Sequence, residues 1–185
     1  TLGGAEIGPA VRLPLVLSGL ESAFANGRPY ETELESLVAL LPDLAVPAAL
    51  TGNAATGLAR PDALALRFEA AIPDILAGRT GESTGDWAQD AVEWAKALLA
   101  LRPAEETEGS TPEAIVSRLE AAVKRQDFEA AAALLGELPE PMRLAAGDIG
   151  ADILALAQAS RFVSGLRAQA LATPEPAEPP AEASN

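Results

Sequence analysis

Large apolar residues recur every three or four positions along much of this chain, in stretches separated by glycine and proline. Such spacing places the apolar side chains on one face of an α-helix. The first two stretches predict helices over 9–25 and 30–41, joined by a turn at Asn26-Gly27, where glycine can take the left-handed conformation that ends a helix. Their apolar faces consist of Leu13, Leu17, Leu20 and Phe24, and of Tyr30, Leu34, Leu37 and Leu41.

A third helix is predicted from Pro61-Asp62, after residues 43–61, whose prolines and glycines predict only short turns. Pro73 should kink this helix or split off its final turn, because proline cannot donate the hydrogen bond of a helix interior. Residues 78–85 (GRTGESTG) follow, and three glycines without a large apolar residue predict a flexible linker. The apolar face of the third helix holds Leu64, Phe68, Ile72 and Ile75.

A helix is predicted at 86–102, and an acidic loop separates it from the next one. Two start signals fit that next helix equally well. Either Ser110 and Glu113 form a capping box, or Thr111 caps the helix with Pro112 in its first position.

A tight turn at Gln126-Asp127 joins this helix to another, and the pair resembles one tetratricopeptide-like unit. We find no second copy at a fixed period, so a repeat array is not expected. The last helix should run from about Met142 to Leu171, where Gly147, Gly150 and Gly165 weaken it or allow close contacts. Its apolar residues are Leu144, Ile149, Ile153, Leu156 and Phe162.

These elements predict an all-α protein in which helical hairpins pack as a small bundle, with a tetratricopeptide-like helix-turn-helix in the C-terminal half. The Pro, Glu and Ala residues near the C-terminus have nothing to bury, which predicts disorder there. The expected organisation is an N-terminal helical region at 1–77, a linker at 78–85, an amphipathic helix at 86–102, a helical domain at 110–172 and a disordered tail at 173–185.

The composition of the chain excludes several classes of function. The chain has 185 residues, with 13 Lys and Arg against 27 Asp and Glu, a net charge of −14, and neither His nor Cys. It therefore lacks an imidazole base, a thiolate nucleophile and the usual ligands of zinc. The negative charge argues strongly against nucleic acid as a partner, and more weakly against anionic membranes. No apolar run approaches the roughly 20 residues that cross a bilayer. The start at Thr1, without a signal peptide, suggests a piece of a longer protein.

Catalysis has no support in the sequence. Serines such as Ser18, Ser117 and Ser164 have no histidine to activate them, and Lys96 and Lys124 are predicted on exposed helix faces. The acidic residues around the loop 103–109 match no calcium-binding spacing. We therefore expect neither an enzyme nor a bound cofactor or metal.

The two tryptophans lie seven residues apart on the predicted helix at 86–102. An apolar stripe that contains tryptophan suits a helix lying in a membrane interface, where tryptophan prefers the headgroup level. The residues alone favour packing of this stripe on the helical core or on a second subunit, because core-facing stripes are the commoner cause of such spacing. The candidate membrane- or partner-binding residues are Trp87, Ala91, Trp94, Leu98 and Leu101.

The order of segments over 13–171 resembles the C-terminal part of bacterial mitofilin-family proteins. The resemblance rests on the element "AFANGRPYETEL" at 23–34, on "DWAQDAVEWAKALLALRP" at 86–103, and on "PEAIVSRLEAAVKRQDFEAA" at 112–131. It implies a membrane-organising scaffold without enzymatic activity, anchored upstream by a transmembrane helix and a coiled coil. In bacteria such a scaffold faces the periplasm, on the inner membrane.

The resemblance further implies a lipid-binding helix at Trp87 to Leu101 and a mitofilin domain at about 112–171. It gives three expected partners: a phospholipid surface, a second copy of the chain, and an outer-membrane or envelope protein. Many relatives end the lipid helix with a basic run, where this chain has Leu99 to Pro103 followed by three glutamates. Lipid contact would then depend on Trp and Leu rather than on charge. The alternative function is a tetratricopeptide-like adaptor that binds a protein partner in a groove, without lipid.

Overall fold

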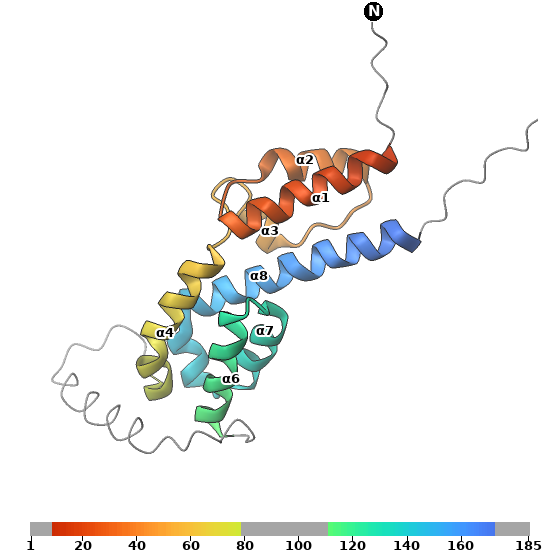
Figure 1. Cartoon of the computed structure of the whole chain (residues 1–185). Coiled ribbons are helices and arrows are strands. Elements are labelled where there is room, and N and C mark those ends of the chain that lie inside the picture. The colour runs from red at the N-terminus through yellow and green to blue at the C-terminus, as the bar shows by residue number, and fades with distance from the viewer. Residues whose placement is uncertain (1–8, 79–110, 173–185) are drawn as a thin grey trace, which may run out of the picture.

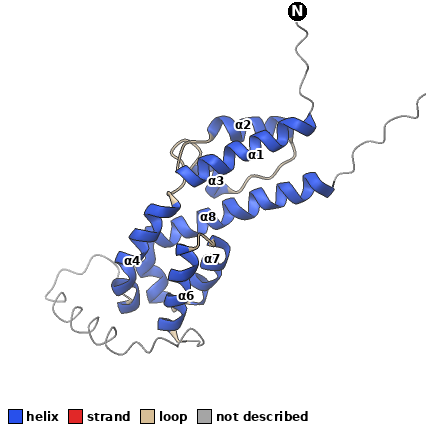
Figure 2. Cartoon of the chain, in the orientation of Figure 1, coloured by secondary structure: helices blue, strands red, loops and turns tan. Residues whose placement is uncertain are grey.

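The computed structural model of the chain describes residues 9–78 and 111–172, and in these residues it has seven α-helices and no strand (Figures 1 and 2). The all-α helical bundle predicted from the sequence is confirmed. The helices are α1 (Pro9–Asn26), α2 (Glu31–Leu40), α3 (Ala48–Gly52), α4 (Pro61–Ala77), α6 (Pro112–Lys124), α7 (Phe128–Glu137) and α8 (Glu140–Ala172).

The corner between α1 and α2 is set by two residues of the "ANGRPY" element. Gly27 has φ +61°, and a Cβ atom there would lie 2.9 Å from the carbonyl oxygen of Leu58, so only glycine fits. The Tyr30 side chain is fully buried, its ring meets that of Phe24 edge to face at 4.9 Å, and its backbone N–H donates to Ala54 O at 2.8 Å. This element therefore holds α1, α2 and the residues after α3 together.

Two features of the N-terminal half differ from the sequence predictions. The stretch expected to contain only turns includes the short helix α3, which carries the fully buried Leu50. In addition, α4 continues through Pro73 to Ala77, so its final turn is not split off. Pro73 is exposed. The helix stops at Gly78, which takes the left-handed conformation with φ +61°.

Helix α6 lies at the centre of the second half of the protein. The consecutive residues Ala114, Ile115 and Val116 are all buried, because α4 covers one side of this helix and α7 covers another. Thr111 caps α6 by accepting a hydrogen bond from the N–H of Ala114 at 3.3 Å. Of the two start signals seen in the sequence, the structure therefore has the Thr111 cap with Pro112 in the first position of the helix.

The predicted turn between α6 and α7 is also present. Gln126 has a positive φ of 59°, and the Asp127 carboxylate caps α7 by accepting from the N–H of Ala130 at 3.1 Å. At the end of α6, Lys124 lies 3.6 Å from the carboxylate of Glu69 on α4, and both side chains of this ion pair are exposed. The cap orders the start of α7, whereas such an exposed ion pair stabilises the contact of α6 with α4 only modestly.

Helix α8 changes direction at Gly147, whose φ of 46° and ψ of −127° are not helical. Met142 and Ala146 before the break and Ile153 and Ala157 after it are all buried, at spacings that suit one helical face. Leu144, which the sequence analysis named among the apolar residues of this helix, lies off that face and is 60% exposed. Gly150 then brings α8 close to α7, since a Cβ atom there would lie 3.4 Å from Leu135 Cδ2.

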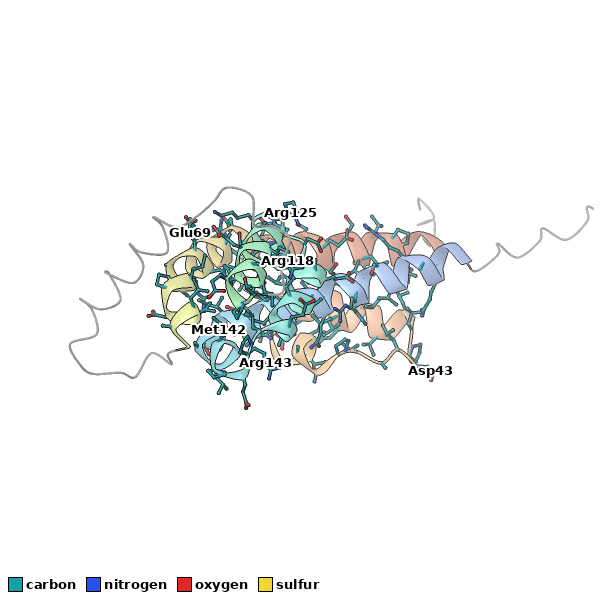
Figure 3. All side chains as sticks on the ribbon, turned by 90° about the horizontal axis from the view of Figure 1, so that it is seen from below. Asp43, Glu69, Arg118, Arg125, Met142 and Arg143 are labelled. Carbon is teal, nitrogen blue, oxygen red and sulfur yellow. The ribbon has the colours of Figure 1, made fainter. Side chains whose placement is uncertain are left out.

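The body is elongated, and α8 runs along most of it (Figure 1). The start of α1 and the end of α8 lie at one end of the body, while the end of α4 and the start of α6 lie at the other. In Figure 3, Asp43 and Glu69 lie near these two ends. The buried apolar residues nevertheless form one continuous cluster with contributions from all seven helices.

Candidate binding groove between α1 and α8

The residues singled out from the sequence as a membrane- or partner-binding site lie outside the described residues. Trp87, Ala91, Trp94, Leu98 and Leu101 all fall within 79–110. The contact of this apolar stripe with lipid, with a second subunit or with the core therefore stays a prediction. The predicted tail at 173–185 and all of the predicted linker beyond Gly78 also lie outside the described part.

Within the described residues, a groove of about 540 Å³ lies between α1 and α8. Residues from α1 form one wall and residues from the second half of α8 form the other, while the first residues of α4 and α7 contribute to the lining. The lining residues are Glu21, Phe24, Ala25, Pro61, Phe128, Leu156, Ala159, Ser160, Val163, Ser164, Arg167 and Ala168.

The inner surface of the groove is apolar and already well covered by its neighbours. Leu156 and Val163 lie seven residues apart, which is two helical turns, so they share one face of α8. Each of these two side chains is 4% exposed, and Phe24 and Phe128 are 7 to 8% exposed. The groove therefore offers little free apolar surface while α1 and α8 keep this arrangement.

The rim of the groove carries both signs of charge. Arg167 Nη2 on α8 lies 2.5 Å from Glu21 Oε2 on α1, so a hydrogen-bonded ion pair spans the two walls. Beside it, Ser160 donates to Glu129 Oε1 of α7 at 3.0 Å, and Arg161 Nε lies 3.4 Å from the other oxygen of that carboxylate. Each rim cation thus faces a carboxylate, and the rim is close to neutral.

The groove holds no arrangement suited to covalent chemistry. Of its two serines, Ser160 donates to Glu129 as described above, and Ser164 donates to the carbonyl oxygen of Arg161 at 3.1 Å, an ordinary contact within a helix. The lysine weighed as a partner for a serine, Lys124, donates to Glu120 Oε1 at 2.8 Å. This hydrogen bond, with the charge of Glu120, raises the pKa of the Lys124 amine above its usual value, which makes it a poorer base near neutral pH.

In residues 9–78 and 111–172, no three acidic side chains come together in a way that could hold a metal ion. In the same residues, no helix combines the length and apolar character needed to cross a bilayer.

Comparison of the chain with known protein families, with curated proteins and with solved structures gave no match. The resemblance to mitofilins therefore depends on the residues quoted above. In the structure, the first of these elements, which ends at residue 34, forms the corner between α1 and α2. The element at 112–131 forms α6, the turn after it and the start of α7. Both elements have a clear structural role.

The sequence located the walls of the groove but not the groove itself. Phe24 and Leu156 were both assigned to apolar helix faces, as the structure has them. Glu21 and Arg167, however, are 146 positions apart. No local pattern signals that two such residues meet, so this feature follows only from the three-dimensional fold.

Proposed function

We propose that this chain is part of a non-catalytic, mitofilin-like scaffold that organises a membrane. It acts on the periplasmic side of a bacterial inner membrane, through apolar contact made by residues 86–102 and through self-association. An outer-membrane or envelope protein is a further partner in this proposal.

The observation that carries the proposal is the location of the two residues that bracket residues 79–110. Gly78 ends α4 and Thr111 caps α6, and these helix ends lie at the end of the body opposite to the start of α1 (Figure 1). A scaffold benefits from such an arrangement, because a membrane-contacting segment and the parts of a longer chain that precede α1 then join the body at different ends.

Charge determines which kind of lipid contact is proposed. Asp86, Asp90 and Glu93 outnumber the cations Lys96 and Arg102 in the predicted helix. Each cation near an anionic surface is worth about 1 kcal/mol, so electrostatic attraction contributes little here. Insertion of tryptophan and leucine is weak for one copy, and self-association multiplies it by avidity.

Co-sedimentation with lipid vesicles tests this function. The wild-type chain should sediment with phosphatidylcholine vesicles, and addition of phosphatidylglycerol should not increase the bound fraction. The double substitution Trp87→Ala/Trp94→Ala should abolish binding. A matched control, Gln89→Ala/Lys96→Ala, changes two residues on the opposite side of the predicted helix and should leave binding intact.

Two results would overturn the lipid function. One is the absence of binding by the wild-type chain, and the other is binding that the tryptophan substitutions leave unchanged. Circular dichroism of the double variant identifies a third case, in which the tryptophans stabilise the fold instead of binding lipid. A loss of helical signal or an early thermal transition would place the tryptophans in the core.

The alternative, a protein-binding adaptor without lipid contact, is favoured by one observation. The α6–α7 helix-turn-helix predicted from the sequence is present, and its Phe128 lines the groove between α1 and α8. If vesicles fail to bind, this groove is the next surface to test. The substitution Ala168→Trp, at an exposed lining residue, would narrow it without changing the buried core.

A further inference from the structure

The helices divide into two groups by how closely they pack. Helix α6 packs closely on α4 and α7, both of these helices pack on α8, and α1 packs closely on α2. By contrast, α1 and α3 approach α8 at few points, and the groove of about 540 Å³ lies along that seam. Packing is therefore least complete where α1–α3 meet α8.

The segment 12–58, here called the N-terminal unit, has internal contacts of its own. Tyr30 donates through its hydroxyl to Leu50 O at 2.8 Å and through its backbone N–H to Ala54 O. Gly57 packs directly on the backbone of Gly27 and Arg28. These contacts connect the corner between α1 and α2 to α3 and to the residues that follow α3, and none of them involves α8.

Covalently, the N-terminal unit joins the rest of the protein through one short connection. Arg60 is extended, with φ −67° and ψ 128°, and α4 starts directly after it at Pro61. A rotation at this point would move α1–α3 as a body, uncover Pro61 of α4 and Phe128 of α7 where they line the groove, and leave the packing of α6 on α4 and α7 in place. Across the seam, the Glu21–Arg167 pair is partly exposed, and such pairs stabilise a structure only modestly.

We propose that the N-terminal unit opens from α8 as a unit, about the connection at Ala59-Arg60, at a lower free energy than global unfolding. Opening separates Glu21 from Arg167 and uncovers the apolar face of α8 that holds Leu156 and Val163. The groove between α1 and α8 is then the closed state of a larger apolar surface. This inference does not depend on the proposed membrane function.

Native-state hydrogen exchange tests the proposal on the intact chain. Amides inside α1 and α2, such as those of Leu20 and Leu37, should share one opening free energy that lies below that of Leu119 in α6. The substitution Arg167→Glu should speed exchange at Leu20 and Leu37 about three- to tenfold, because it removes an attraction and adds a repulsion across the seam. It should leave Leu119 unchanged.

Two further variants make the test specific. The control Arg161→Glu disrupts an ion pair with α7 on the same helix, and it should not change exchange at Leu20 or Leu37. The double variant Glu21→Arg/Arg167→Glu, which swaps the two charges of the ion pair, should restore the wild-type rates of hydrogen exchange at Leu20 and Leu37. The proposal is wrong if Leu20, Leu37 and Leu119 exchange at one common free energy, or if Arg167→Glu accelerates all three equally.

Discussion

The hydroxyl of Tyr30 donates a 2.8 Å hydrogen bond to the carbonyl oxygen of Leu50, inside a fully buried contact between the α1–α2 corner and α3. The substitution Tyr30→Phe keeps the ring and leaves that carbonyl oxygen without its partner. We expect a loss of about 1–2 kcal/mol in the free energy of unfolding. Chemical denaturation measures it. Because Ser36 is partly exposed and its hydroxyl bonds within its own helix, Ser36→Ala is a control that should change stability little.

Tyr30 also makes stability depend on alkaline pH. Burial raises the pKa of its hydroxyl from 10.0 to about 12, so the folded protein holds this proton after the unfolded chain has released it. Stability should therefore be intact below pH 10 and fall as the pH rises from about 10 to 12. Tyr30 is the only tyrosine of the chain, so the ultraviolet absorbance of tyrosinate reports its titration directly. A midpoint near 10 in the folded protein would contradict this account.

Gly147 should tolerate no side chain. Its φ of 46° with ψ of −127° is a conformation that essentially only glycine adopts, although a Cβ atom would meet no neighbour there. Gly147→Ala should therefore destabilise the protein by about 1–3 kcal/mol through backbone strain alone.

Gly165 provides the matched comparison on the same helix. It has a helical backbone and open space around the missing Cβ atom. Gly165→Ala should stabilise the protein by about 0.5–1 kcal/mol, because alanine loses less conformational freedom on folding. Thermal unfolding of both variants gives the two opposite signs, and equal effects would refute the strain at Gly147.

The cap at Asp127 is a further test of local structure. Its carboxylate accepts from the N–H of Ala130 at the start of α7. Asp127→Ala should lower the free energy of unfolding by about 1 kcal/mol, whereas Asp127→Asn retains a capping oxygen and should cost much less. An equal loss for the two variants would assign the effect to charge rather than to the cap.

The sequence predicted those features that depend on neighbours along the chain. Helix faces, the stop at Gly27, the cap at Thr111 and the turn at Gln126 follow from local spacing and backbone preference. The break in α8 was not located, because three glycines are present in that helix and nothing local shows that Gly147 is the one that breaks it. Helix α3 was missed, since five residues carry too little periodicity to identify a helix.

The groove and its ion pair could not be predicted, for a different reason. Glu21 and Arg167 come together only when α1 and α8 lie antiparallel, and that arrangement depends on packing across the whole core. The opposite holds for the candidate site at 86–102. Its pattern is evident in the sequence, and its contacts lie outside the residues that the structure describes.

The emission of the two tryptophans tests the central claim, membrane contact by residues 86–102, most directly. Trp87 and Trp94 are the only tryptophans of the chain, so the signal reports this segment alone. We expect emission typical of exposed tryptophan without lipid and a blue shift when phosphatidylcholine vesicles are added. Emission that is already blue-shifted without lipid, or that vesicles leave unchanged, would contradict the account.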